Sequence, residues 1–118
     1  IIGGGMEIGE SFEEVIRREA REETGIELGE LRLLALCNGA DRFITYPNGD
    51  IVYSTSVVFK TNSFSGEICN DPDETIDHQF FGKDNLPDEI NEFDRKFIEI
   101  WLKDSDSVTI YTANGNER

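Results

Sequence analysis

The 118-residue sequence predicts an α/β fold, and more specifically an α/β/α sandwich built on a mixed, largely antiparallel sheet. Two segments, 12–24 and 91–103, carry apolar residues at helical spacing and lie on either side of a central stretch with strand patterns. Within that stretch, residues 51–59 read as a strand and follow an Asn-Gly pair, which is a strong hairpin signal. Helix, sheet and helix in this order lead to the sandwich.

The first helix has recognisable start and stop signals. Ser11 has Glu14 three residues later, which is the pattern of a capping box, and Gly25 is expected to end the helix. Its apolar side is expected to face the core and comprises Phe12, Val15, Ile16 and Ala20.

Carboxylates share this apolar side. At about 100° per residue, Glu19 and Glu23 fall within the angular range of the apolar residues, and Glu22 falls at its edge. An acidic, solvated helix is the alternative interpretation, but solvated charges belong opposite the apolar stripe. Two or three carboxylates are therefore expected to point inward.

Neighbouring buried carboxylates raise one another's pKa values unless positive charge lies between them. Arg18 is four residues before Glu22 and can supply part of that charge, whereas Arg17 and Arg21 are expected to face solvent. The positive charge that is still required indicates a hard cation with oxygen ligands. Mg²⁺ fits, because it binds through a few carboxylates together with substrate phosphates.

The central stretch is predicted to form the sheet, with a turn at Pro47-Asn48-Gly49-Asp50. Strands are expected at 31–37 with an extension through 43–46, at 51–59, at 66–69 and at 77–81.

The second helix, 91–103, is expected to pack on the sheet through an apolar stripe. That stripe comprises Ile90, Phe93, Phe97, Ile100 and Trp101. The whole chain, 1–118, is expected to form one domain, with 105–118 as a candidate loose tail.

A set of fixed residue types around the first helix resembles the Nudix box, Gly-x5-Glu-x7-Arg-Glu-U-x-Glu-Glu-x-Gly-U, where U is a bulky aliphatic residue. The matching residues are Gly4, Glu10, Arg18, Glu19, Glu22, Glu23, Gly25 and Ile26. Ala20 at the first U position is the single departure, and a chance match at this spacing would be rare. The chain is thus similar to Nudix hydrolases, the mutator-type nucleotide pyrophosphohydrolases, and its predicted sandwich is also the Nudix fold.

The resemblance assigns roles to the matched positions. Arg18 and Glu10 are implied to orient the carboxylates. The implied metal ligands are Glu19, Glu22 and Glu23, with a backbone carbonyl near Gly4.

The implied reaction is Mg²⁺-dependent hydrolysis of a pyrophosphate bond, with water attacking phosphorus; Mn²⁺ is the alternative ion. A carboxylate must accept the proton of the water, either one of the box, such as Glu22, or one from a later loop. Glu74 is the best match for the later group by position, although a solvated acidic loop remains an alternative for its segment. Glu22, Glu74 and Arg18 are therefore the candidate catalytic residues.

The implied substrate is a nucleoside diphosphate linked to another moiety. No second motif of the coenzyme A or NADH subgroups follows the box, and Pro47 and Tyr46 lie too far downstream for the ADP-ribose and diadenosine polyphosphate patterns. A nucleoside triphosphate, a nucleotide sugar or an ADP-ribose type of substrate stays open. Two other functions compete: a Nudix-like module that senses a nucleotide with little or no catalysis, and an acidic interaction domain.

Composition adds limits on the partners. The net charge of −14 argues against binding nucleic acid through a basic surface. Cys37 and Cys69 are not in a CxxC pair and are expected to be reduced core thiols, with a disulfide as the lesser alternative. The only histidine, His78, is expected to be structural. With no apolar run long enough to span a membrane, a cytoplasmic protein is expected.

The chain begins at Ile1, shortly before the box, whereas Nudix domains carry strands ahead of it. The natural protein is therefore expected to be longer at its N-terminus, with strands of the central sheet missing here. The sheet edge that this leaves open is compatible with a homodimer.

Overall fold

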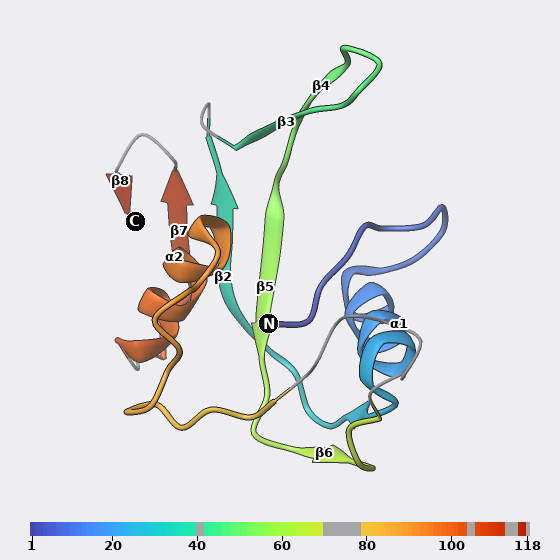
Figure 1. Cartoon of the computed structure of the whole chain (residues 1–118), viewed down its shortest axis with the longest axis vertical. Helices are drawn as coiled ribbons and strands as arrows, with labels where there is room; N and C mark the ends of the chain where they lie inside the picture. The colour runs from blue at the N-terminus through green and yellow to red at the C-terminus, as the bar shows by residue number, and fades with distance from the viewer. Residues whose placement is uncertain (40–41, 70–78, 104–105, 113–115, 118) are drawn as a thin grey trace. The chain divides into compact units, whose positions relative to one another are not determined.

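The computed structural model describes residues 1–39, 42–69, 79–103, 106–112 and 116–117 (Figure 1). The chain divides into two compact units. Unit 1 comprises Ile1–Leu31 and Thr61–Ile90, and unit 2 comprises Arg32–Lys60 and Asn91–Arg118. Within the described ranges, no helix has both the length and the apolar character needed to cross a membrane.

Unit 1 is built on helix α1 (Phe12–Thr24) and a small antiparallel sheet of β1 (Glu27–Leu28) and β6 (Phe64–Ser65). Gly25 ends α1 in the left-handed conformation, with φ of 79°, and its N–H donates to the carbonyl of Arg21 at 3.0 Å. The predicted stop signal is thus confirmed. It lets the chain turn directly from the helix into β1.

The buried side of α1 is shifted toward its C-terminal end. Ala20 and Thr24 are buried, as is Ile26 just after the helix, and Val15 and Ile16 are half-buried. Phe12, expected in the core, is instead 58% exposed. Helical side chains tilt toward the N-terminus, so a large residue at the first helical position projects past the packed surface.

Unit 2 contains a four-stranded sheet in the order β5-β2-β7-β8 (Figure 1). β2 pairs antiparallel with β5 and parallel with β7, while β8 pairs antiparallel with β7, so the sheet is mixed as predicted. The bounds are β2 (Arg32–Asn38), β5 (Ser56–Lys60), β7 (Thr109–Thr112) and β8 (Asn116–Glu117).

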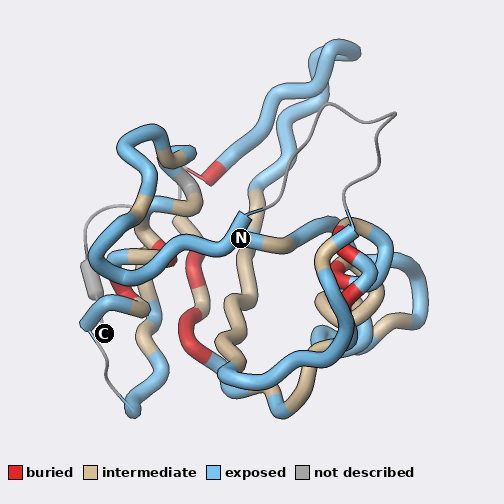
Figure 2. The backbone as a smooth tube through the Cα atoms, turned by 60° about the horizontal axis from the view of Figure 1, so that its bottom comes forward, coloured by how far each residue is buried: buried red, intermediate tan, exposed pale blue. Residues whose placement is uncertain are grey.

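Helix α2 (Glu92–Leu102) contributes to the core of unit 2, as its apolar spacing predicts. Phe97 and Ile100 are buried. Burying a side chain of this size contributes about 1.5–3 kcal/mol to the stability of the folded state. Both residues form one cluster with buried residues of β2, namely Leu34, Ala35 and Cys37. Figure 2 shows these buried segments on β2 and α2.

The expected strands are only partly confirmed. The segment 51–59 is divided into β4 (Ile51–Tyr53) and β5, and the expected strand at 66–69 is absent. There Gly66 turns with φ of 92°, and the N–H of Cys69 donates to the carbonyl of Thr24, at 2.8 Å, rather than to a strand.

The end of the expected strand at 77–81 is also irregular over 79–81, and 77–78, with His78, lie outside the described residues. Phe80 is held by its ring, which stacks on Phe64 with the centroids 5.3 Å apart. By contrast, β7 forms within the segment considered as a loose tail. Its parallel partner β2 is about seventy residues earlier, a pairing that local sequence patterns do not reveal.

Between β2 and β5 the chain forms the hairpin of β3 (Phe43–Thr45) and β4. Its turn is the predicted one: Gly49 has φ of 93°, and the N–H of Tyr46 donates to the carbonyl of Asp50 at 2.8 Å. The Asn48 side chain reinforces this turn by accepting from the N–H of Asp50 at 3.0 Å.

Candidate metal and phosphate site

The glycine-rich segment before α1 is folded into a defined turn. Gly9 has φ of 88°, and the N–H of Glu10 donates to the carbonyl of Glu7 at 3.1 Å. Ser11 then caps the helix, because its Oγ accepts from the N–H of Glu14 at 3.2 Å. The helix start predicted at Ser11 is confirmed. The preceding loop folds back along the first turns of the helix, where Gly5 contacts Arg18.

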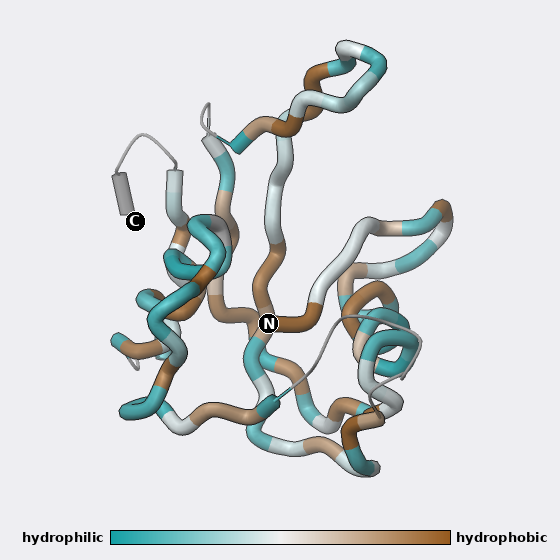
Figure 3. Tube along the Cα trace, viewed as in Figure 1, coloured by the Kyte–Doolittle hydropathy of each residue, from teal (hydrophilic) through white to brown (hydrophobic). Residues whose placement is uncertain are grey.

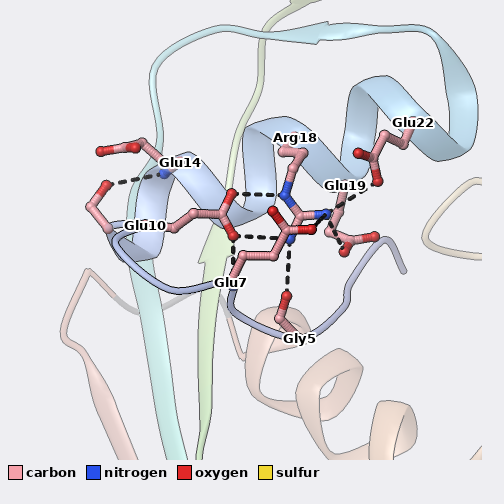
Figure 4. A network of polar contacts seen from close by, with 8 residues as sticks. Gly5, Glu7, Glu10, Glu14, Arg18, Glu19 and Glu22 are labelled. Atoms are coloured by element: carbon pink, nitrogen blue, oxygen red, sulfur yellow. Dashed lines mark hydrogen bonds and ion pairs between the residues drawn. The ribbon is translucent and has the colours of Figure 1, made fainter.

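Arg18 joins this loop to the helix through all three nitrogens of its guanidinium (Figure 4). Nε and Nη2 donate to the two oxygens of Glu10 at 2.7 and 3.0 Å, a bidentate pair. Nη1 donates to Oε1 of Glu19 at 2.9 Å and to Oε2 of Glu22 at 3.1 Å. Nη2 also donates to the carbonyl of Gly5 at 3.0 Å. We call this set of contacts the Arg18 network.

Glu7 belongs to the same network and was not anticipated from the sequence. Its N–H donates to Oε1 of Glu10 at 2.8 Å, and its own carboxylate lies 3.9 Å from Nη1 of Arg18. The available signal was its spacing, three residues before Glu10 across a glycine turn. Several carboxylates thus surround a single guanidinium, which leaves the region strongly negative.

The electrostatics of the network favour its charged form. The side-chain hydrogen bond from Arg18, followed by the backbone bond from Glu7, lowers the pKa of Glu10 from its ordinary value of 4.5. In return, the hydrogen bond to Glu10 raises the pKa of Arg18. The side chains of Arg18 and Glu10 are mostly shielded from solvent, so this pair is screened less than a surface ion pair.

The pH dependence of stability tests this pairing. Because the pKa of Glu10 is depressed in the folded state, its contribution is fully present above pH 4.5 and is lost as the pH falls further. Glu10→Gln should therefore lower the urea midpoint of unfolding at pH 7, and the deficit should shrink toward pH 3. Glu14→Gln, whose side chain stands outside these contacts, should show no such pH-dependent deficit. An equal deficit for Glu10→Gln at both pH values would contradict the assignment.

Gly4 forms a close cradle for the carboxylate of Glu19. A Cβ built on Gly4 would overlap with Oε1 of Glu19 and lie 2.7 Å from Oε2. The Glu19 side chain is only 14% exposed, as expected for an inward-facing carboxylate. The backbone of Gly4 thus lies directly against the Glu19 carboxylate, and carboxylate oxygens suit a hard divalent cation.

A methyl group at Gly4 should disturb this point selectively. Gly4→Ala is expected to lower metal affinity and turnover by about 10- to 100-fold, because Glu19 must move to admit the Cβ. Gly3→Ala is the matched control, since a Cβ there meets nothing within 4 Å. Titration with Mn²⁺ followed by steady-state kinetics measures both effects. Equal behaviour of the two variants would show that the cradle has no functional role.

The other two predicted ligands, Glu22 and Glu23, are not held as closely as Gly4 and Glu19 are. The Glu22 side chain is 60% exposed and turned toward Arg18, while Glu23 is half-buried and makes an interaction of its own. Among the residues that the structure describes, no three acidic, histidine or cysteine side chains are grouped closely enough to hold a metal. Glu74 lies outside the described residues. The structure thus brings the backbone of Gly4 against Glu19, whereas Glu22 and Glu23 lie on the same helix without forming a closed group of ligands with Glu19.

The prediction that Arg17 faces solvent is wrong. Its guanidinium donates to the carbonyls of Leu28 and Gly29, so it ties α1 to the strand that follows. Arg21 does face solvent and pairs there with Glu27 at 2.6 Å. Sequence spacing along the helix could not reveal the Arg17 contacts, because both carbonyls lie beyond the turn at Gly25.

The thiols also differ in part from the expectation. Cys37 is buried in the core of unit 2, where burial raises the pKa of its thiol. Cys69 is exposed rather than in a core, and both cysteines are free.

Comparisons with known proteins agree with the box. A sequence model of the NUDIX domain family matches residues 1–100. The NAD-capped RNA hydrolases NudC of Yersinia pestis (strain Pestoides F) and Yersinia pseudotuberculosis serotype O:1b (strain IP 31758) are each 29% identical over 87 residues. These matches cover 74% of this chain and 30% of each relative, so the chain spans less than a third of the length of these curated relatives.

A solved structure shares the fold. The mutator MutT protein from Bacillus halodurans matches with a TM-score of 0.65 and 27% sequence identity, covering 98% of this chain and 76% of that chain. The α/β fold predicted from the sequence is therefore confirmed as the Nudix fold. With most of the sequence matched by the family model, and with Glu10, Glu19 and Glu22 of the box in contact with Arg18, the chain belongs to the NUDIX domain family.

Proposed function

We propose that this protein hydrolyses a pyrophosphate bond in a nucleoside diphosphate linked to another moiety, with Mg²⁺ or Mn²⁺ as cofactor. Membership of the Nudix family supports hydrolysis of nucleotide derivatives. The observation that carries the proposal is the Glu19 carboxylate, which is shielded from solvent, held by Arg18 and cradled by Gly4. Shielding a carboxylate from water among other negative charges costs free energy unless a cation binds beside it.

In this proposal Glu19 and Glu23 are the central metal ligands, joined by Glu22 and the carbonyl of Gly4. A carboxylate has two oxygens, so Glu19 can accept from Arg18 through Oε1 and offer Oε2 to a cation. A divalent cation bound there would supply charge screening at the diphosphate and a lower pKa for a water molecule.

The remaining residues position these ligands and move the proton. Arg18 fixes the direction of the Glu19 carboxylate, and Glu10 fixes Arg18 through the bidentate pair. Glu22 is exposed at the same guanidinium and is one candidate to accept the proton of the attacking water; Glu74 is the other.

The substrate class is proposed from charge and similarity. A net charge of −14 favours a small anionic substrate recognised through metal over a nucleic acid recognised through basic residues. The similarity to NudC, a hydrolase of NAD-capped RNA, adds NAD and an NAD-capped oligonucleotide to the candidates. The free thiols of Cys37 and Cys69 support the proposed cytoplasmic location.

A substrate panel tests the proposal. The protein is incubated with nucleoside triphosphates, nucleotide sugars, ADP-ribose, NAD and an NAD-capped oligonucleotide, with Mg²⁺, with Mn²⁺ and with a chelator. Products are separated to show which phosphate–phosphate bond is cut, and reaction in ¹⁸O-water shows which phosphorus is attacked. Metal-dependent cleavage of at least one compound is expected. Nucleotide and metal binding with no cleavage of any compound would instead establish the sensing module.

A further inference from the structure

Every hydrogen-bond donor of the Arg18 guanidinium is in use. A guanidinium carries five N–H donors. Those on Nε and Nη2 donate twice to Glu10 and once to the carbonyl of Gly5. The remaining two, on Nη1, donate to Glu19 and Glu22. The Arg18 side chain is only 19% exposed, so the loss of one of these acceptors leaves a shielded donor unpaired, which costs free energy.

The two carboxylates on Nη1 are held unequally. Glu19 accepts at 2.9 Å, and its carboxylate is enclosed by the backbone of Gly4. Glu22 accepts at 3.1 Å, and most of its side chain is in solvent, where other rotamers are available to it. Glu22 is therefore the carboxylate that leaves Arg18 more easily.

The proposed function requires Glu22 to leave. It places Glu22 either beside Glu19 and Glu23 at a cation or beside the attacking water. In the structure Glu22 is instead turned toward Arg18, and the described acidic side chains form no group that could hold a metal. When Glu22 turns away to join such a group, Nη1 loses one of its two acceptors.

Glu7 is the carboxylate placed to follow Glu22. Its Oε1 lies 3.9 Å from Nη1 of Arg18, so a movement of about 1 Å brings it to hydrogen-bond distance. The N–H of Glu7 donates to Oε1 of Glu10 at 2.8 Å, which holds its backbone beside the guanidinium, while its exposed side chain is able to rotate.

The two competing carboxylates come from different segments. Figure 4 shows Glu7 reaching Arg18 from the loop and Glu22 reaching it from the helix. Hydrophilic segments lie on both the loop and α1 in Figure 3. The loop thus supplies an acceptor for Arg18 that does not depend on the helix carboxylates.

We propose that Glu7 is a positioning residue that replaces Glu22 on Nη1 of Arg18 when a divalent cation binds. The exchange keeps all donors of Arg18 paired while Glu22 turns toward the cation or the attacking water. Arg18, and through it the Glu19 carboxylate, then keeps its direction in the metal-bound protein. Because this role rests on the divalent-cation site of the proposed function, Glu7 is needed only when metal is bound.

Glu7→Gln is expected to raise the dissociation constant for Mn²⁺ by about 3- to 10-fold, because a neutral amide is a weaker acceptor for the guanidinium. Without metal its urea midpoint should equal that of the wild type, since an exposed pair at 3.9 Å contributes little to stability. The electron paramagnetic resonance signal of free Mn²⁺ measures binding, and urea unfolding with a chelator measures the midpoint. A midpoint lowered in the absence of metal would assign Glu7 a structural role instead.

A second background separates the exchange from a simple effect of charge. Removing a negative charge near a cation weakens binding even if no exchange takes place. In Glu22→Gln the amide oxygen can remain on Nη1, so Arg18 needs no replacement acceptor. Adding Glu7→Gln to that variant should therefore change the dissociation constant by less than about 2-fold. The same fold-change in both backgrounds would show an effect of charge alone and would overturn the exchange.

The same titrations distinguish the role of Glu7 from the catalytic proposal. Saturable Mn²⁺ binding by the wild type, with an unchanged dissociation constant in Glu7→Gln, would reject the role of Glu7 and leave the metal site in place. No saturable binding by the wild type would reject both. Hydrolysis is not measured in any of these experiments, so the result does not depend on the identity of the substrate.

Discussion

Replacing Glu19 with glutamine is expected to lower turnover by about three orders of magnitude. Glutamine has nearly the same shape, and its amide oxygen can still accept from Nη1 of Arg18, so the fold should be kept. The change removes one negative charge at the point where Gly4 leaves room only for the carboxylate. A loss of several kcal/mol in the stabilisation of the charged transition state follows.

The measurement is kcat/KM on the best substrate of the panel, with the metal affinity determined separately by Mn²⁺ titration. Glu14→Gln is the matched control, because it makes the same chemical change on the same helix at an exposed residue. Wild-type rates for that control and an unchanged unfolding midpoint for Glu19→Gln would locate the loss in the chemistry. A Glu19→Gln enzyme with wild-type kcat/KM would remove Glu19 from the mechanism.

Arg18→Lys is expected to lower kcat/KM by about 10- to 100-fold even though the positive charge is kept. The guanidinium makes a bidentate pair with Glu10 and also contacts Glu19 and Glu22 from a fixed plane. A lysine ammonium has three donors on a flexible stem and cannot reproduce that fork. The Glu19 carboxylate should then lose its fixed direction.

The role of Arg18 as a positioning residue predicts a particular split between readouts. Metal affinity and kcat should both fall, while KM for the nucleotide should change little, because Arg18 contacts carboxylates. Arg21→Lys, three residues along the helix and paired only at the surface with Glu27, should behave as the wild type. A large change confined to KM would indicate instead that Arg18 contacts the substrate directly.

The features of the site that could be predicted are those fixed by the geometry of a single helix. Ser11 and Gly25 have local chemistry that starts and stops a helix, and both act as expected. The approach of Arg18 to Glu22 and the inward position of Glu19 follow from 100° per residue. These inferences need no knowledge of what the helix packs against.

Features that depend on distant segments could not be obtained in this way. The carbonyls that bind Arg17 lie beyond the helix, and β7 is ordered by its pairing with β2. Phe12 shows the converse, because its apolar character indicates burial but its place at the helix end leaves it in solvent. In each case the deciding contact is one that a periodic pattern does not contain.

The two cysteines differ in exposure, which allows a spectroscopic probe to be attached beside the helix of the Nudix box. Cys37 is fully buried with a raised pKa, whereas Cys69 is exposed and joined by its N–H to Thr24 in the last turn of α1. A maleimide dye or nitroxide should therefore label this chain at Cys69 and leave Cys37 unmodified. Such a probe would report metal binding at the far end of the helix in real time, without any engineered cysteine.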